Sequence, residues 1–205
     1  MQSLIQQEIQ KLISSLQQIQ KDDLLISIVE KVAAECIEAL QKGKKILFAG
    51  NGGSAADAQH LAAELLSRLN YNRPGLPAIA LTTDTSALTA IGNDYGFENL
   101  FSRQVEALGH EGDILIAIST SGRSKNILRA LDAARIKNMT TIGMTGIHAP
   151  LMSECCDWVI NIPSTETPKI QECHIMFGHI ICALIENAIF GEEYGPQQMK
   201  VVEGK

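Results

Sequence analysis

The spacing of hydrophobic residues predicts two helices at the start of the chain. In the first, apolar residues recur at intervals of four and three positions, at Ile5, Ile9, Leu12, Leu16 and Ile19. This spacing forms a narrow a/d seam of the kind that packs one helix against another. Residues 21–23 interrupt the pattern, and a second amphipathic helix follows at 24–40. The seam could pack on its own domain or on a second subunit, and the pattern leaves both open.

After residue 43 the pattern changes to short apolar runs that alternate with helical segments. The runs are continuous, which is typical of strands buried on both faces of a parallel sheet. These predicted strands are 46–49, 78–81, 114–118, 141–144 and 159–162. The predicted helices between and after them are 55–70, 99–108, 125–137 and 170–190. Such alternation predicts an α/β fold, a three-layer sandwich with a five-stranded parallel sheet, preceded by the N-terminal helices.

The length of the chain favours a single structural domain with added elements. A chain of 205 residues falls short of what two independent cores usually need. We expect a helical pair at 1–41, a sheet domain at 42–192 and a C-terminal tail at 193–205. The polar segment from Gly191 onward is expected to be loosely ordered.

Composition and charge narrow the classes of function. The chain has 17 Lys and Arg against 23 Asp and Glu, a net charge of −6, and this acidic balance argues against a nucleic-acid partner. No apolar run approaches the roughly 18 residues of a membrane helix, so no membrane span is expected. The N-terminal segment has neither a basic region nor an apolar region after it, so no signal peptide is expected. The five cysteines are odd in number and sit mostly in apolar stretches. They are expected to be reduced packing residues in a bacterial-type cytoplasm.

A glycine-rich loop is the first candidate for function. Gly50-Asn51-Gly52-Gly53-Ser54 comes directly after one predicted strand and directly before a helix. Glycines let the backbone approach a ligand, and the helix N-terminus offers free N–H groups to an anion. The loop lacks the lysine of a Walker loop and the GxGxxG spacing of a dinucleotide fold. A simple tight turn is therefore an equally open interpretation.

The second candidate loop contains four hydroxyl groups around one glycine. Ser119, Thr120, Ser121 and Ser124 flank Gly122 after the strand at 114–118. In a parallel sheet, ligands gather beyond the carboxyl ends of the strands, and these hydroxyls at a helix N-terminus suit a phosphate monoester. In the alternative interpretation, Ser124 only caps the helix. Capping requires one hydroxyl and leaves the other three without a role. The loop is predicted to bind phosphate.

Two predicted helices carry a set of possible metal ligands. His60 and Glu64 are four residues apart and share one helix face, while Gln171 and His179 lie about 80° apart around another helix. Two imidazoles, a carboxylate and an amide oxygen could together hold a zinc-like ion. A His and a Glu at this spacing are also common on solvated helix faces. His174, on the same helix as Gln171, is expected to be a structural, hydrogen-bonding histidine.

These motifs, in this order, resemble the SIS (sugar isomerase) domain, a flavodoxin-like five-stranded parallel sheet that binds phosphosugars. Within that group, residues 50–65 are similar to the glycine-loop and helix motif of the phosphoheptose isomerases. Further segments that resemble this family are 72–75, 92–96, 119–124 and 170–174, with His179 beyond them. The resemblance spans roughly residues 44–190, and the two N-terminal helices fit it too.

The resemblance implies an activity and an assembly. The family interconverts sedoheptulose 7-phosphate and D-glycero-D-manno-heptose 7-phosphate by enediol proton transfer, the first step of ADP- or GDP-heptose and lipopolysaccharide core biosynthesis. It implies a homotetramer with the N-terminal helices in a central bundle, and one zinc ion per subunit. No nucleic acid or membrane partner is implied.

The resemblance also assigns roles to residues of this chain. It implies acid–base roles for Glu64 and His179, and zinc ligation by His60, Glu64, Gln171 and His179. The implied substrate contacts are Asn51, Gly52, Gly53, Ser54, Glu64, Asn93, Asp94, Ser119, Thr120, Ser121, Ser124 and Gln171. The tail after Gly191 has no clear counterpart in the family.

Two other functions are compatible with the same fold. One is a non-catalytic SIS protein that binds the bacterial replication initiator, and the other is a sensor that binds a phosphosugar without converting it. A binding protein has no need of Glu64 or His179, and both residues are present. The sequence therefore favours the isomerase.

Overall fold

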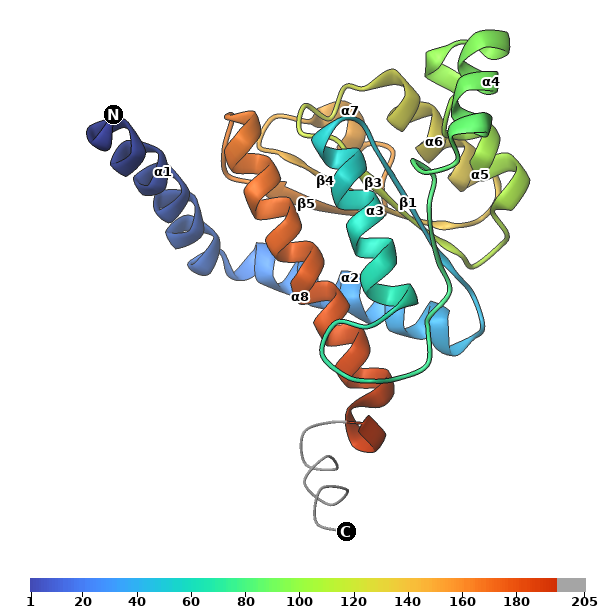
Figure 1. Cartoon of the computed structure of the whole chain (residues 1–205), viewed down its shortest axis with the longest axis horizontal. Helices are drawn as coiled ribbons and strands as arrows, with labels where there is room; N and C mark the ends of the chain where they lie inside the picture. The colour runs from blue at the N-terminus through green and yellow to red at the C-terminus, as the bar shows by residue number, and fades with distance from the viewer. Residues whose placement is uncertain (195–205) are drawn as a thin grey trace.

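The computed structural model describes residues 1–194 of the chain. It begins with two helices, α1 (Gln2–Gln20) and α2 (Asp23–Gln41), which confirms the predicted pair. The side chain of Asp22 accepts a hydrogen bond from the backbone N–H of Leu25 at 3.0 Å. This cap satisfies one of the free N–H groups at the start of α2. In Figure 1, α1 extends away from the body of the molecule.

The core is a five-stranded parallel sheet, as predicted. Its strands are β1 (Ile46–Gly50), β2 (Ala78–Ala80), β3 (Ile114–Ile118), β4 (Thr140–Gly146) and β5 (Trp158–Ile162). Their order in the sheet is β2-β1-β3-β4-β5, and every neighbouring pair is parallel. All residues of β1 and β3 are buried, because helices cover both faces of the sheet. The α/β fold class is therefore confirmed.

Each face of the sheet has its own hydrophobic core. Ile46 and Phe48 point toward α2, α3 (Gly53–Leu66) and α8 (Thr167–Tyr194), whereas Leu47 and Ala49 point toward α5 (Ser102–Leu108) and α6 (Lys125–Ile136). Figure 1 shows α3 and α8 side by side on one face. The alternation of side chains along β1 thus produces the three layers.

Several boundaries differ from the prediction, and two α-helices and one 3₁₀ turn were not predicted. The sequence pattern missed α4 (Thr85–Tyr95), the short helix α7 (Pro150–Ser153) and a 3₁₀ turn, η1 (Phe97–Asn99). Helix α4 has no fully buried residue and packs on the core through two partly buried apolar residues, so its apolar stripe is narrower than those on which the prediction relied. Its start is instead marked by Asp84, whose side chain accepts a hydrogen bond from the Ala87 N–H at 2.9 Å.

The ends of two predicted helices also need correction. Helix α3 stops at Leu66 rather than at residue 70, because the segment that follows turns back past α8 toward β2. Helix α8 starts at Thr167 and continues to Tyr194, so the first four residues of the expected loose tail, 191–194, are helical. Residues 195–205 of that tail lie outside the described part of the chain.

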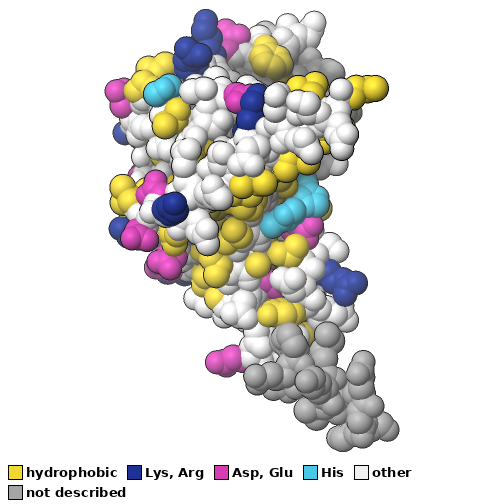
Figure 2. All heavy atoms as spheres, turned by 90° about the vertical axis from the view of Figure 1, so that its left-hand side faces the viewer, with side chains coloured by type: hydrophobic (Ala, Val, Ile, Leu, Met, Phe, Trp, Pro, Cys, Tyr) yellow, Lys and Arg dark blue, Asp and Glu magenta, His cyan; other side chains and the backbone are white. Residues whose placement is uncertain are grey.

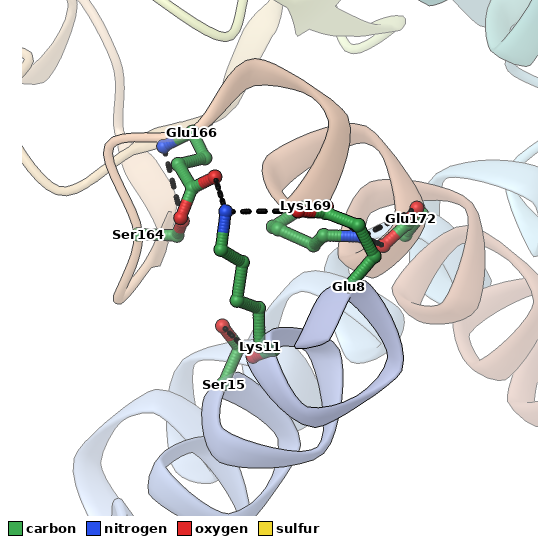
Figure 3. A network of polar contacts seen from close by, with 7 residues as sticks. All are labelled: Glu8, Lys11, Ser15, Ser164, Glu166, Lys169 and Glu172. Carbon is green, nitrogen blue, oxygen red and sulfur yellow. Dashed lines mark hydrogen bonds and ion pairs between the residues drawn. The ribbon is translucent and has the colours of Figure 1, made fainter. Parts of the chain in front are cut away.

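A polar network links α1 to the start of α8 (Figure 3). The Lys11 ammonium lies 2.9 Å from Glu8 and 2.8 Å from Glu166. The Lys169 ammonium lies 3.5 Å from Glu8 and 3.0 Å from Glu172. Apart from Lys169, these side chains are well exposed, so each pair is worth little on its own. The network nevertheless orients α1 relative to the helix that carries Gln171 and His179.

The a/d seam of α1 is covered along only part of its length. Ile19 is buried, and Leu12 and Leu16 pack against the core of the same chain. Ile5 and Ile9 remain 60% and 54% exposed. Figure 2 shows hydrophobic side chains among charged ones on the face seen there. The seam therefore packs on its own domain at its C-terminal end and is uncovered at its N-terminal end.

Helix α8 is long and apolar enough to cross a membrane if judged by length and composition alone. It nevertheless packs closely on α2 and α3. Ten of its residues are buried, among them Phe177, Ile181 and Ile185. This is the pattern of a core helix.

Candidate active site

The glycine loop after β1 lets the backbone make two close approaches. A Cβ at Gly50 would lie 2.2 Å from the carbonyl oxygen of Ser54, and a Cβ at Gly53 would lie 2.3 Å from Nε2 of Gln171. Gly52, with φ +56°, adopts a left-handed conformation at the start of α3, which costs glycine little. The loop is thus a tight turn, and it also brings Gln171 of α8 against the N-terminus of α3.

The hydroxyl loop after β3 has a well-defined shape. Gly122 has φ +61°, and a Cβ there would lie 2.3 Å from the Cβ of Ala149. The Ser119 hydroxyl donates to the Ser124 hydroxyl at 3.2 Å. Ser124 occupies the N-cap position of α6 but makes no capping hydrogen bond through its side chain. Helix capping therefore does not account for this hydroxyl.

The two loops lie together at one edge of the sheet, because they follow the neighbouring strands β1 and β3. Asn51 of the first and Asn126, two residues after the second, form a reciprocal pair of side-chain hydrogen bonds at 2.9 and 2.8 Å. Asn126 is buried, so this pair is shielded from competition with water. It fixes the glycine loop relative to the hydroxyl loop.

Three of the predicted functional side chains meet between α3 and α8. The Nε2 atoms of His60 and His179 are 2.8 Å apart, and Oε1 of Glu64 lies 3.1 Å from Nε2 of His60. The helices can approach this closely because α8 has Gly178 at the crossing, where a Cβ would lie 2.5 Å from Leu61. Residues separated by more than 110 positions in the sequence thus form one cluster.

The cluster has the donor set that zinc prefers. His60, Glu64 and His179 offer ligand atoms that all lie within 4.8 Å of one another. Two nitrogens on one tetrahedral zinc ion lie about 3.3 Å apart when the bonds are about 2.0 Å long, so the two rings would separate by roughly 0.5 Å to admit it. Two imidazoles and a carboxylate match known zinc chemistry. Gln171 is held at the glycine loop, and its place as a fourth ligand stays a prediction.

Comparison with known proteins decides the family. The SIS domain model matches residues 6–146. The phosphoheptose isomerase of Burkholderia pseudomallei is 59% identical over 172 residues, which cover 84% of this chain and 87% of that protein. The enzyme of Aneurinibacillus thermoaerophilus is 55% identical over 194 residues, covering 95% of this chain and 98% of that protein. The chain belongs to the phosphoheptose isomerase family.

A solved structure agrees with this family assignment. Phosphoheptose isomerase from Neisseria gonorrhoeae superposes with a TM-score of 0.85 at 42% identity, covering 91% of this chain and 98% of that one. The fold class and the resemblance drawn from the sequence are both confirmed. The chain is accordingly a phosphosugar isomerase, and the two non-catalytic alternatives lose their support.

The sequence pattern missed one acidic residue beside the cluster of this isomerase. Asp57 lies one turn before His60 on α3, and its Oδ2 atom is buried without a hydrogen-bond partner among the described residues. Burial raises the pKa of Asp57, and the nearby His60 and His179 rings offset part of that rise. Positions 57, 60 and 64 follow helical spacing, so their shared face was a signal in the sequence.

Two predicted substrate contacts of this isomerase lie in α4, a helix that the sequence pattern did not predict. Asn93 and Asp94 occupy the last turn of α4, where they are exposed and the Asn93 amide donates to the Asp94 carboxylate at 2.8 Å. A cleft of about 350 Å³ separates α4 from the glycine loop. Its lining includes Asn51, Gly52, Thr82, Leu88 and Gly92.

The remaining histidine on α8 is His174. His174 is fully buried, but neither of its ring nitrogens has a hydrogen-bond partner of standard geometry among the described residues. Burial lowers the pKa of His174 to about 4, although the backbone of Thr145 offsets part of that effect. The ring is therefore neutral at physiological pH, and the Thr145 backbone is its hydrogen-bonding contact, so its expected role as a structural, hydrogen-bonding histidine stays a prediction.

Proposed function

We propose that this isomerase converts sedoheptulose 7-phosphate to D-glycero-D-manno-heptose 7-phosphate by enediol proton transfer. The observation that carries the proposal is the meeting of His60, Glu64 and His179. The relatives named above support the substrate class, because they are phosphoheptose isomerases. The reaction needs one group that moves a proton between carbons and another that serves the oxygens. A carboxylate and an imidazole meet these needs.

The hydroxyl loop binds the substrate phosphate in this proposal. Ser119, Thr120, Ser121 and Ser124 surround the N-terminus of α6, where free backbone N–H groups favour an anion. Asn51, Gly52, Gly53, Ser54 and Gln171 contact the sugar from the glycine loop and α8, and Asn93 and Asp94 do so from α4. Anchoring the phosphate at one end orients the reacting carbons at the other.

Glu64 and His179 carry the proton transfers. Glu64 removes a proton from C1 of the ketose, and the electron pair forms the C1–C2 double bond of the enediol as O2 gains a proton. His179 moves the oxygen-bound protons, taking one from O1 and supplying one to O2. Glu64 then returns its proton to C2, which forms the aldose carbonyl at C1. Atoms and charges balance without any co-substrate.

Zinc is the proposed cofactor, one ion per subunit, held by His60, Glu64, Gln171 and His179. When bound, the ion would polarise the substrate carbonyl and stabilise negative charge on its oxygen. A carboxylate that ligates zinc is a weaker base, so the role of Glu64 as base requires it to be free of the metal during proton transfer. His60, with no proton-transfer role, serves as a ligand.

The proposal includes an assembly and a cellular role. Burying the exposed Ile5 and Ile9 of α1 in a helical bundle supports a homotetramer. The five free thiols support a place in the cytoplasm, where disulfides are rare. The product feeds ADP- or GDP-heptose synthesis for the lipopolysaccharide core.

Substitution of the proposed base tests this function. Glu64→Gln keeps the size of the side chain and removes the base, so kcat should fall by about 10²–10⁴-fold. In D₂O, the proton on Glu64 exchanges with solvent while the enediol is bound, so the wild type should also place deuterium at C2 of the aldose, whereas the variant should not. A folded Glu64→Gln protein that forms aldose at the wild-type rate would contradict the proposal.

A further inference from the structure

One buried ion pair ties together the two helices that carry the catalytic cluster. The Nε atom of Arg73 donates to Oε1 of Glu186 at 2.9 Å, and both side chains are fully buried. Arg73 lies in the segment after α3, and Glu186 lies on α8. Figure 1 shows this segment passing beside the C-terminal half of α8 on its way to β2.

The Arg73 guanidinium also closes the end of α3. It donates to the backbone carbonyl of Glu64 at 2.9 Å, of Leu65 at 2.7 Å and of Pro74 at 2.9 Å. The last carbonyls of a helix have no partners within the helix, and a cation at this end is favourable. One of these hydrogen bonds ends on the backbone of Glu64 itself.

The carboxylate of Glu186 holds the other side of the same segment. It accepts hydrogen bonds from the backbone N–H groups of Leu69 at 3.0 Å and Asn70 at 2.7 Å. Burial raises the pKa of Glu186, but these bonds and the Arg73 guanidinium together hold the pKa below its usual value. Glu186 is thus ionised at neutral pH, and both of its carboxylate oxygens accept hydrogen bonds.

We propose that Arg73 and Glu186 are positioning residues for the isomerase reaction. They set the last turn of α3 relative to α8, and so they set Glu64 relative to His179. Glu186 lies seven residues, or two helical turns, after His179 on the same helix. This inference rests on the proposed roles of Glu64 and His179.

The geometry of the cluster shows why such positioning matters. Three ligand atoms on two helices lie within 4.8 Å of one another, and misplacement by about 1 Å can cost 100-fold in rate. Gly178 and Leu61 fix the distance between the helices at their crossing. A single crossing still permits α3 to turn or slide, and the Arg73–Glu186 pair prevents this from a second point.

The test compares two disrupting variants with a matched control. Arg73→Gln and Glu186→Gln each leave one buried charge without its partner. Asp113→Asn breaks another shielded ion pair, with Lys45, at the opposite end of the sheet. With sedoheptulose 7-phosphate, the first two variants should lose tenfold or more in kcat while KM stays within threefold. Asp113→Asn should unfold at lower denaturant concentration but keep kcat within twofold.

Zinc affinity gives a second readout that does not depend on turnover. In competition with a chromogenic chelator, Glu186→Gln should bind zinc at least tenfold more weakly than the wild type, and Asp113→Asn should not. An unchanged kcat in folded Glu186→Gln, or an equal loss in Asp113→Asn, would overturn the inference while leaving the proposed function intact. An inactive wild type whose zinc affinity still depends on Glu186 would instead overturn the proposed function. If Arg73→Gln fails to fold, the isosteric Glu186→Gln variant decides.

Discussion

At the scale of single residues, burial changes the chemistry of a histidine that the sequence does not distinguish from its neighbours. His60, His174 and His179 all lie on helices of the α3–α8 layer, but His174 alone is fully buried. Its ring stays neutral because protonation would place a positive charge in the buried interior, away from water. Which of the three histidines faces a partner and which faces the core depends on the packing of α3 on α8. The sequence alone does not contain that information.

The buried ring of His174 predicts a pH dependence of stability. Its pKa is about 4 in the folded chain and about 6.5 when unfolded, so below pH 6.5 the unfolded chain binds more protons. The free energy of unfolding should therefore fall as the pH drops from 6.5 to 4, by about 3 kcal/mol in total, and level off below. Urea titrations of the wild type and of His174→Phe, with chelator present, measure the difference. Parallel curves across this range would contradict the prediction.

At the scale of elements, apolar periodicity located the strands and the long helices. The central strands β1 and β3 are buried throughout because both faces of the sheet are covered there. The same reasoning failed for α4, whose stripe consists of the partly buried Leu88 and Ile91. Asn93 and Asp94, two of the implied substrate contacts, therefore lie in a helix that was not predicted. The remaining local signal for α4 was its N-cap residue, Asp84. A single Asp is equally typical of a turn, because its side chain bonds to the nearby backbone in both settings.

The hydroxyl loop provides a prediction about loop geometry. Gly122→Ala would place a methyl group in a left-handed backbone conformation and 2.3 Å from Ala149. Gly43→Ala imposes the same kind of backbone strain, at φ +74°, with no atom within 4 Å. If the loop binds phosphate, Gly122→Ala should raise KM for the phosphosugar tenfold or more. Gly43→Ala should lose about 1 kcal/mol of stability and keep KM within twofold. Equal KM values in the two variants would exclude a phosphate role for the loop.

At the scale of the whole molecule, the sequence predicted the members of the site better than their arrangement. His60 and Glu64 share a helix face, so local spacing was enough to pair them. Their meeting with His179 depends on the crossing of α3 and α8 at Gly178, which is a tertiary contact. Asp57 and the Arg73–Glu186 pair escaped notice because their significance comes from burial, and a local pattern does not show which carboxylate is buried.

The uncovered part of the α1 seam predicts the assembly. If Ile5 and Ile9 pack in a subunit interface, the double variant Ile5→Lys/Ile9→Lys should dissociate the oligomer, because each charge would have to be buried without a partner. Ile136→Lys is the matched control, since Ile136 is 83% exposed on α6. Light scattering after size-exclusion chromatography should show the mass of four chains for the wild type and the control, and a smaller mass for the double variant. A monomeric wild type would contradict the proposed tetramer.

The most direct test of the whole account is an assay of the purified protein with sedoheptulose 7-phosphate, with and without a chelator. The account predicts formation of the aldose heptose phosphate, loss of turnover when the metal is removed, and recovery when zinc is added. Absence of aldose with zinc present and the oligomer intact would contradict it.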